Sequence, residues 1–195
     1  MNYSSLSIEQ KLDLIFGLYK NHGHEDYIGE PVSQIEHMCQ SAQLAEREGF
    51  DSEVILAAFF HDIGHLLNHL ENTESMWGFG VKRHEQIGAD FLRSLGFPEK
   101  IPQLVENHVQ AKRYLTFRFP EYLEKLSEAS KKTLEFQGGP MNNDEALAFE
   151  NDHLFDISLL MRSWDEEAKE ENIPLPDLEK YISLAREVLY SCLEN

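Results

Sequence analysis

The segment AAFFHDIGHLL, residues 57–67, places His61, Asp62 and His65 directly behind an unbroken apolar run. Each of these side chains can bind a proton or a metal ion. Successive side chains on a helix diverge by about 100°, so His61 and Asp62 reach one ion only if it lies close to the helix in a buried site. His65 lies four residues after His61 and shares its face, which suits a metal, a supporting or a substrate-binding role.

A His-Asp pair at a helix end is by itself more often structural than metal-binding, because the two partners can hydrogen-bond each other or a carbonyl group. Single histidines elsewhere also have simple explanations. His84 could be an exposed residue at a helix start, and the helix dipole favours a histidine such as His108 at a helix C-terminus. Whether this His-Asp pair binds a metal ion therefore has to be judged from the elements around it.

The first elements are predicted to be helices. Capping boxes at Ser7 and Ser33 begin two helices that end near Gly23 and Gly49, and the second helix carries His37 in its first turns. A third helix starts at residue 51 or 52 and continues through the segment quoted above. Its VILAAFF core is apolar on every side, which is typical of a central, buried helix.

The rest of the chain also has helical periodicity. We predict a helix over residues 84–95, a short helix over 98–108, a helix over 121–136, a long helix over 153–170 and a last amphipathic helix to the C-terminus. Asp165 lies on or beside the apolar face of the long helix. Residues 68–83 are polar and contain glycines, so they could form a lid. The sequence thus predicts an all-α fold in a single domain over residues 1–195.

Bulk composition limits the class of partner. The chain has 195 residues and a formal net charge of −18, which repels nucleic acids and anionic lipid surfaces. It has no signal peptide pattern and no apolar run near the ~20 residues that cross a bilayer. We expect a cytoplasmic protein with a small-molecule substrate and neither a nucleic-acid nor a membrane partner; its oligomeric state is left open. Cys39 and Cys192 are predicted to be packed thiols.

The order of the candidate ligands resembles a known signature. His37 on one helix, His61 and Asp62 behind the next, and Asp165 on a late helix are similar to the H…HD…D metal signature of the HD-domain superfamily. Members of that superfamily are all-α proteins with a metal centre inside the bundle. The resemblance implies that these four residues bind metal.

Two further histidines, His84 and His108, resemble the additional ligands of dinuclear HD proteins and imply a second metal ion. A carboxylate can bridge two cations whereas an imidazole cannot, so Asp62 is the natural shared ligand. Nitrogen and oxygen ligands without a thiolate suit iron, manganese or zinc. We therefore expect an HD-domain helical bundle with a buried dinuclear metal site.

Two segments narrow the resemblance. Residues 25–37, EDYIGEPVSQIEH, and residues 126–139, LSEASKKTLEFQGG, are similar to the PhnZ family of mixed-valence diiron HD oxygenases. This resemblance implies two iron ions in the Fe(II)/Fe(III) state, with dioxygen as co-substrate. It also implies organophosphonate catabolism, in which the carbon-phosphorus bond of 2-amino-1-hydroxyethylphosphonate is cleaved to give glycine and phosphate.

The same resemblance implies roles in the substrate pocket. Tyr27 would close the open coordination position of one iron until substrate arrives, and Glu30 would receive the substrate amine. Together with His65 these residues would form the catalytic set. A dianionic phosphonate needs several donors, and charged donors bind it most strongly. The implied phosphonate ligands are His65, Lys112, Ser130, Gln137 and Arg162.

Three alternatives stay open. A metal-dependent HD phosphohydrolase would act on a nucleotide or phosphate ester without dioxygen, and Lewis-acid catalysis would suffice for it. A noncatalytic metal-holding module would lack a matching anion pocket. Within the PhnZ family, the substrate could be the N-trimethylated analogue, which gives glycine betaine, and aromatic residues of the MWGFG segment could line its larger pocket. We prefer the primary amine.

Overall fold

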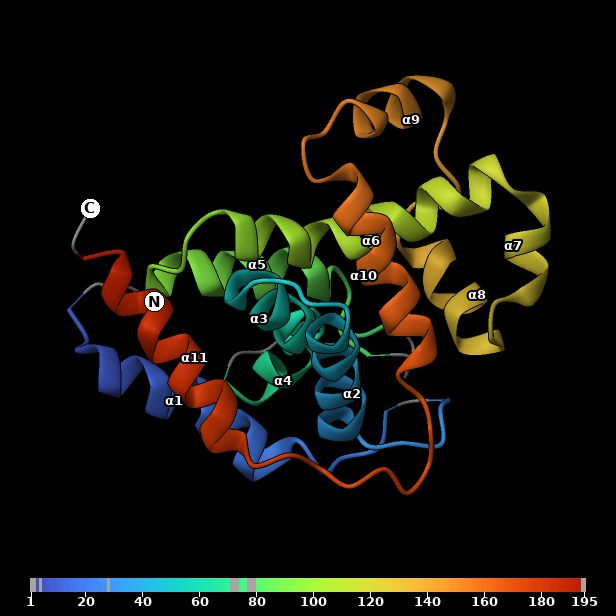
Figure 1. Cartoon of the computed structure of the whole chain (residues 1–195). Coiled ribbons are helices and arrows are strands. Elements are labelled where there is room, and N and C mark those ends of the chain that lie inside the picture. Colours follow the sequence, from blue (N-terminus) through green and yellow to red (C-terminus); the bar gives the residue numbers. More distant parts are fainter. Residues whose placement is uncertain (1–2, 4, 28, 71–73, 77–79, 194–195) are drawn as a thin grey trace.

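The computed structural model describes residues 3, 5–27, 29–70, 74–76 and 80–193 (Figure 1). Regular structure in these ranges is helical, and the only β-type pairings described are two isolated bridges, Asp26 with Ser33 and Ser75 with Val81. The predicted all-α fold is confirmed. None of the helices described is long and apolar enough to span a membrane.

Helix α3, Ser52–Phe60, lies in the middle of the bundle (Figure 1). It begins at Asp51, whose side chain accepts a hydrogen bond from the Val54 N–H, and every residue from Val54 to its end is buried. Helices α2 (Gln34–Arg47), α6 (Lys100–Arg118) and α11 (Leu178–Ser191) all pack against it. This surround explains why its sequence is apolar on every side.

The other helices extend the bundle in pairs. Helix α1 (Ile8–His22) packs along α11, α5 (His84–Leu95) packs along α6, and α10 (Phe155–Glu167) contacts both α2 and α6. Aromatic rings join α1, α3 and α11, because the Phe59 ring lies 4.6 Å from that of Tyr19 and 4.3 Å from that of Tyr181. Such contacts fix the position of α3, and with it the residues that follow α3.

Three short helices lie beyond the C-terminal half of α6 (Figure 1): α7 (Pro120–Lys125), α8 (Glu128–Phe136) and α9 (Asn143–Glu150). A second apolar cluster supports this region, and it contains Ala111, Tyr114, Met141, Ala146 and Phe149. The region thus has packing of its own beside the main core. A single domain over the whole chain stays a prediction.

Several predicted helix boundaries were wrong. The helix predicted to begin at Pro98 begins at Lys100 and continues to Arg118, because buried residues keep helical spacing well past His108. His108 is therefore in the middle of a helix rather than at its C-terminus. The helix predicted over residues 121–136 is broken into α7 and α8, since the Ser127 side chain caps α8. Helix α9 was not predicted.

The two cysteines differ. Cys39 is buried in α2, as predicted, whereas Cys192 is exposed just after α11, which contradicts its prediction as a packed thiol. The last helix ends at Ser191, so Cys192 lies beyond the apolar face that packs on the core.

Candidate metal centre

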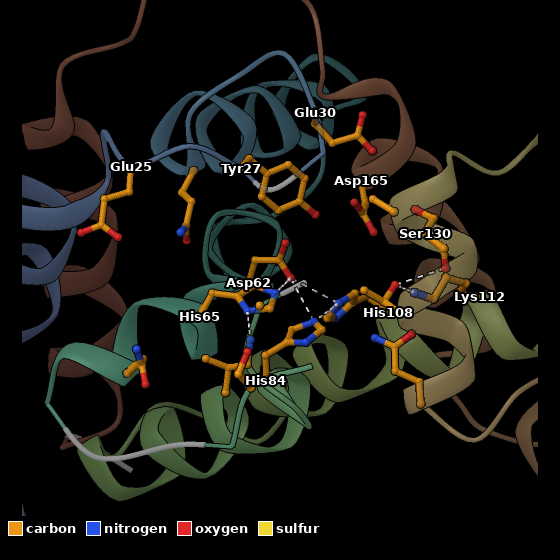
Figure 2. A pocket seen from close by; sticks show the side chains of 18 of the residues that line it. Glu25, Tyr27, Glu30, Asp62, His65, His84, His108, Lys112, Ser130 and Asp165 are labelled. Carbon is orange, nitrogen blue, oxygen red and sulfur yellow. Dashed lines mark hydrogen bonds and ion pairs between the residues drawn. The ribbon is translucent and has the colours of Figure 1, made fainter. Parts of the chain in front are cut away.

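A helix break positions the central carboxylate. Helix α3 ends at Phe60, and a second short helix, α4 (Ile63–Leu66), begins after Asp62. The prediction that His61 and Asp62 lie on one continuous helix is therefore wrong. Aspartate is a favoured N-cap residue, worth ~1 kcal/mol, yet Asp62 occupies the N-cap position of α4 without a capping hydrogen bond. Its carboxylate lies instead near four imidazoles, and Figure 2 shows two of them, His84 and His108, beside Asp62.

The two oxygens of Asp62 face different imidazole pairs. Its Oδ2 lies 3.7 Å from His37 Nε2 and 3.5 Å from His61 Nε2. Its Oδ1 lies 3.1 Å from His84 Nε2 and 3.5 Å from His108 Nε2. Each carboxylate oxygen is thus nearest to its own pair of nitrogens, with His65 Nε2 further from Oδ1 at 4.0 Å, and this is the arrangement expected of a carboxylate shared by two cations.

Asp165 completes one of the two groups. Its Oδ1 lies 3.3 Å from His37 Nε2 and 3.9 Å from His61 Nε2, while its Oδ2 accepts a hydrogen bond from Arg162 Nη1. Asp165 is in the last turns of α10, which packs on α2 and so reaches His37. The Nε2 atoms of one imidazole pair therefore face two carboxylates, and among the residues described those of the other pair face Asp62 alone.

Backbone carbonyl groups orient three of the imidazoles. In His37, His61 and His108 the Nδ1 atom lies within hydrogen-bonding distance of a main-chain oxygen. A carbonyl can only accept, so Nδ1 carries the hydrogen and the Nε2 lone pair is left for a metal ion. The three carbonyl groups are those of Ala168, Ala58 and Val105, at 2.9, 2.8 and 2.5 Å respectively.

His65 has the opposite tautomer. Its Nδ1 accepts a hydrogen bond from the Val81 N–H at 3.0 Å, so Nε2 carries the hydrogen. Burial, reinforced by the nearby His84 charge, lowers the pKa of His65 to about 3. The neutral ring stacks on His84 with centroids 4.1 Å apart. The geometry makes His65 a hydrogen-bond donor beside the metal cluster rather than a ligand.

Two glycines permit the close packing around these rings. A Cβ on Gly64 would lie 2.0 Å from the His84 carbonyl oxygen, so only glycine lets α4 approach the start of α5. Gly80 has φ of +93°, and a Cβ there would lie 2.5 Å from His65 Cε1. The first contact brings His84 to Asp62, and the second holds the His65 ring in place.

The cluster is buried and electrostatically coupled. Burial alone would lower the pKa of His61, but the charges of Asp62 and Asp165 raise that pKa to about 9. Burial would raise the pKa of Asp62, but the His61 charge and hydrogen bonds from His108 hold it well below its usual value. A metal ion can replace the protons that balance these carboxylates.

The donor set fits two metal ions. The ligand atoms of His37, His61 and Asp62 all lie within 4.8 Å of one another, and so do those of Asp62, His84 and His108. All five residues are buried. The predicted site for a dinuclear centre inside the bundle is confirmed as a cluster that could hold one.

A cavity of about 250 Å³ opens beside this cluster (Figure 2). Two cations line it, and both are deeply buried: Lys112 is 4% and Arg162 3% exposed. Burial, followed by the Arg162 charge, lowers the pKa of Lys112 to about 7. Lys112 Nζ donates to Thr133 Oγ1 at 3.0 Å. The cavity wall therefore carries a lysine and an arginine beside the candidate metal ligands, and the arginine is paired with Asp165 and Glu166.

Some polar atoms of this wall have no partner within the described protein. Arg162 Nη2 and Gln137 Oε1 are buried without a hydrogen bond. Buried polar groups are rarely left unpaired, and the Gln137 amide can turn to present its NH2 group instead. These atoms, with Lys112, form a site that an anion would satisfy.

The five residues predicted to hold the phosphonate do come together. They line one cavity with Asp62 and Asp165, and they are His65, Lys112, Ser130, Gln137 and Arg162. Two other basic residues of this region have partners of their own: Arg113 pairs with Glu145, and Lys131 pairs with Glu128.

Tyr27 and Glu30 also line the cavity. The Tyr27 ring stacks on His37, with centroids 4.1 Å apart and 13° between planes. Burial, then the charges of Asp62 and Asp165, raises the pKa of Tyr27, so its hydroxyl stays protonated. Glu30 Oε1 accepts hydrogen bonds from Lys169 Nζ at 2.7 Å and from Ser127 Oγ at 2.9 Å.

Part of the predicted lid lies outside the described residues, namely 71–73 and 77–79. These include Trp77, Gly78 and Phe79 of the MWGFG segment, so their predicted place in a pocket is not described. Other residues of the 68–83 segment do line the cavity, among them Asn68, Ser75 and Val81.

Two histidines outside the predicted ligand set, His22 and His69, form a cluster of their own. The rings of His22 and His69 stack with centroids 3.6 Å apart, and both bond the Glu25 carboxylate, at 3.0 and 3.2 Å. His24 and His153 are exposed.

Sequence reasoning missed three residues of the site: Thr133, Lys169 and Glu85. Thr133 could have been found, since it lies one helical turn after Ser130. Glu85 could also have been found, since it is the sequence neighbour of His84, whereas Lys169 contacts Glu30 only through the tertiary fold.

Comparisons with known proteins agree with this geometry. Residues 35–185 match the HD domain family. The chain is 41% identical over 194 residues to an uncharacterised protein of Acanthamoeba polyphaga mimivirus, which covers all of this chain and 89% of that protein. A 1-hydroxy-2-(trimethylamino)ethylphosphonate dioxygenase (glycine-betaine-forming) of Leisingera caerulea is 38% identical, with 89% of this chain and 88% of the relative covered. A hydroxymethylphosphonate dioxygenase of Gimesia maris is 34% identical, with 95% and 90% covered. The chain belongs to the HD-domain family.

Proposed function

We propose that this protein is a diiron oxygenase that uses dioxygen to cleave the carbon-phosphorus bond of a small 1-hydroxyphosphonate. One observation carries the proposal: the oxygens of Asp62 face separate imidazole pairs, in the same cavity that buries Lys112 and Arg162. Two relatives whose names describe phosphonate dioxygenases support the substrate class. The PhnZ resemblance supports a mixed-valence Fe(II)/Fe(III) pair, which the nitrogen and oxygen ligands suit.

The proposed reaction balances without an external reductant. It is R–CH(OH)–PO3²⁻ + O2 → R–COO⁻ + HPO4²⁻ + H⁺, in which the substrate's C–H and C–P bonds supply the four electrons that reduce dioxygen. The iron pair supplies dioxygen activation and electron transfer when bound. A primary amine in R gives glycine, a trimethylammonium gives glycine betaine, and R as hydrogen gives formate.

The ligand set divides into two groups around Asp62. One ion would be held by His37, His61 and Asp165, the other by His84 and His108, and Asp62 would bind both. The second group has fewer protein ligands among the described residues, so it has more room for substrate or dioxygen. The carbonyl groups behind three of the rings fix a hydrogen on Nδ1 and direct Nε2 inward, where a metal ion would replace any proton.

The cavity wall would hold the phosphonate group. Lys112 and Arg162 supply positive charge, and the unpartnered Arg162 Nη2 gains an acceptor when the anion binds. Ser130 and Gln137 supply directional hydrogen bonds, and His65 donates from Nε2–H. Burial of Lys112 and Arg162 limits the competition of water for the phosphonate oxygens that they bind.

Tyr27 would guard the metal centre. Its ring lies flat on His37, and its hydroxyl stays protonated beside the carboxylates. We propose that it closes the open coordination position until the substrate hydroxyl displaces it. Because the hydroxyl is a proton donor in this setting, it can hydrogen-bond a carboxylate in either position.

The test uses protein purified anaerobically with iron and supplied with ascorbate. Each of the three 1-hydroxyphosphonates is added, and oxygen uptake is followed together with phosphate release. The proposal expects equal amounts of oxygen consumed and phosphate released. Phosphate release from phosphomonoesters without oxygen would identify a phosphohydrolase instead.

A further inference from the structure

We infer that Lys169 makes this protein select 1-hydroxyphosphonates that carry no positive charge at the end of the molecule away from phosphorus. The inference rests on the proposed function and deepens it by naming the substrate class. It departs from the preference for a primary amine that the sequence suggested, because the structure adds a charge that the motif around Glu30 does not contain.

The relatives show that this end of the substrate varies. The name of one describes a substrate with a trimethylamino group, which is a permanent cation, and the name of another describes hydroxymethylphosphonate, which has no cationic group. The phosphonate and hydroxyl groups are common to both. Selection between such substrates must therefore depend on how favourably the cavity binds a positive charge at the end of the substrate away from phosphorus.

A cation in this cavity needs a carboxylate that is not already neutralised. Asp62 and Asp165 belong to the metal cluster and face its imidazoles. Among the described residues that line the cavity, the other carboxylates are those of Glu25 and Glu30. The environments of Glu25 and Glu30 therefore determine whether the cavity can bind a cationic substrate group.

Glu30 already has a cation. Its Oε1 accepts from Lys169 Nζ at 2.7 Å and from Ser127 Oγ at 2.9 Å. The pair is shielded from solvent, with 11% of the Glu30 side chain and 17% of the Lys169 side chain exposed. In such surroundings the attraction is weakly screened, so this wall of the cavity has no net charge.

A substrate ammonium would have to share or displace Lys169. Sharing places two cations on one carboxylate, and displacement leaves a lysine charge poorly solvated. A trimethylammonium is affected most, because it cannot donate a hydrogen bond and depends on the net field alone. An uncharged substrate meets neither penalty.

Glu25 does not replace Glu30. It lies on the opposite side of the metal cluster from Lys112 and Ser130 (Figure 2), and its carboxylate is bonded to His22 and His69. Nearly half of its side chain, 48%, is exposed. Water and counterions screen an exposed charge strongly, so Glu25 gives little selection inside the cavity.

Lys169 lies in the chain between a contact to the metal cluster and a contact to the substrate pocket. The preceding residue, Ala168, supplies the carbonyl that orients His37. One residue later, the Lys169 side chain reaches Glu30. The end of α10 therefore positions a metal ligand and sets the charge of the substrate pocket.

The experiment compares kcat/KM of iron-loaded protein for hydroxymethylphosphonate, 2-amino-1-hydroxyethylphosphonate and its N-trimethyl analogue. The unaltered protein is expected to prefer the uncharged substrate by about tenfold or more. Lys169→Met should shift this preference by at least about tenfold toward the cationic substrates, mainly through KM. A purely structural role would change all three substrates alike.

Lys180→Met is the matched control. It removes another lysine–glutamate pair, Lys180 with Glu46 at 2.5 Å, on the outer surface of the bundle. The substrate preference should stay unchanged. If Lys169→Met does not fold, as judged by circular dichroism, Lys169→Gln provides the same test with a polar side chain.

Three outcomes overturn the inference: a preference of the unaltered protein for either cationic substrate, an unchanged preference in the Lys169 variants, or a shift produced by Glu25→Gln instead. Failure of the proposed function is a different result. In that case the iron-loaded protein consumes no oxygen with any of the three phosphonates.

Discussion

The candidate metal ligands and the candidate anion ligands lie next to each other but differ in how their hydrogen bonds are satisfied. In His37, His61 and His108 the nitrogen away from the cluster is bonded to the backbone. At the anion end, Arg162 Nη2 and Gln137 Oε1 have no partner within the described protein. The backbone therefore fixes the metal ligands before an ion binds, whereas the anion end holds poorly solvated groups that substrate must satisfy.

His84 is the exception among the metal ligands. Its Nδ1 has no hydrogen-bond partner, and neither has Glu85 Oε2, which lies 3.6 Å away. A small movement would close this contact and orient the ring as a carboxylate orients many metal-binding histidines. The His84 side of the centre is thus less firmly organised than the His37 side.

The largest expected effect comes from Asp62→Ala. Because the two carboxylate oxygens serve both groups of ligands, the variant should lose both iron ions, along with the spectroscopic signature of a coupled pair. Asp165→Ala should affect chiefly the ion held by His37 and His61. Metal analysis of the two variants checks this difference, and equal losses in both would contradict a shared Asp62.

Lys112→Met should weaken substrate binding and at the same time stabilise the folded protein. Loss of a buried charge should lower kcat/KM by about 10²-fold. Removing a charge that is costly to bury should raise the free energy of unfolding of the substrate-free protein by ~1 kcal/mol. Kinetics and denaturant unfolding measure the two effects. Arg113→Met is the neighbouring control, since Arg113 pairs with Glu145 outside the cavity, and it should leave kcat/KM unchanged.

The same lysine predicts a pH dependence. The lowered pKa of Lys112, about 7, means that its ammonium is present below pH 7 and is lost as the pH rises above it. Substrate capture should therefore decline above pH 7, and a profile of kcat/KM against pH measures this limb. In Lys112→Arg the charge persists, so the limb should move to higher pH. An unmoved limb would assign it to another group.

Glu85→Gln should have the smallest effect in this series. The amide cannot accept the His84 hydrogen as strongly as a carboxylate, so affinity for the ion on the His84 side should fall by about tenfold. Titration of metal-free protein with iron should show one weakened and one unchanged binding event. Asp90→Asn, on the exposed face of the same helix, should leave both events unchanged.

Local sequence signals predicted much of the fold. The capping boxes at Ser7 and Ser33 and the apolar run before His61 are short-range patterns, and each marks an observed helix. The break after Phe60 was not predicted. It accompanies the contacts of the Asp62 carboxylate with four imidazoles and the close approach of Gly64 to α5. Both sets of contacts are tertiary.

The candidate site was predictable where residue types carried the signal. Histidines and aspartates in the HD order pointed to the candidate ligands, and the structure brings these residues together. Lys169 carried no such signal, because its partner Glu30 lies 139 residues away and both could equally be solvated charges. The tautomer of His65 was equally hidden, since it depends on the main-chain N–H of Val81.

The missing cap of α4 has a dynamic consequence. Its first turn receives no side-chain hydrogen bond from Asp62, so coordination of that carboxylate supplies a restraint that the helix otherwise lacks. Amide hydrogens of residues 63–66 should therefore exchange with deuterium faster in metal-free protein than in iron-loaded protein, while those of α3 change little. Binding of the metal ions would then stabilise the first turn of α4, which directly follows their shared ligand Asp62.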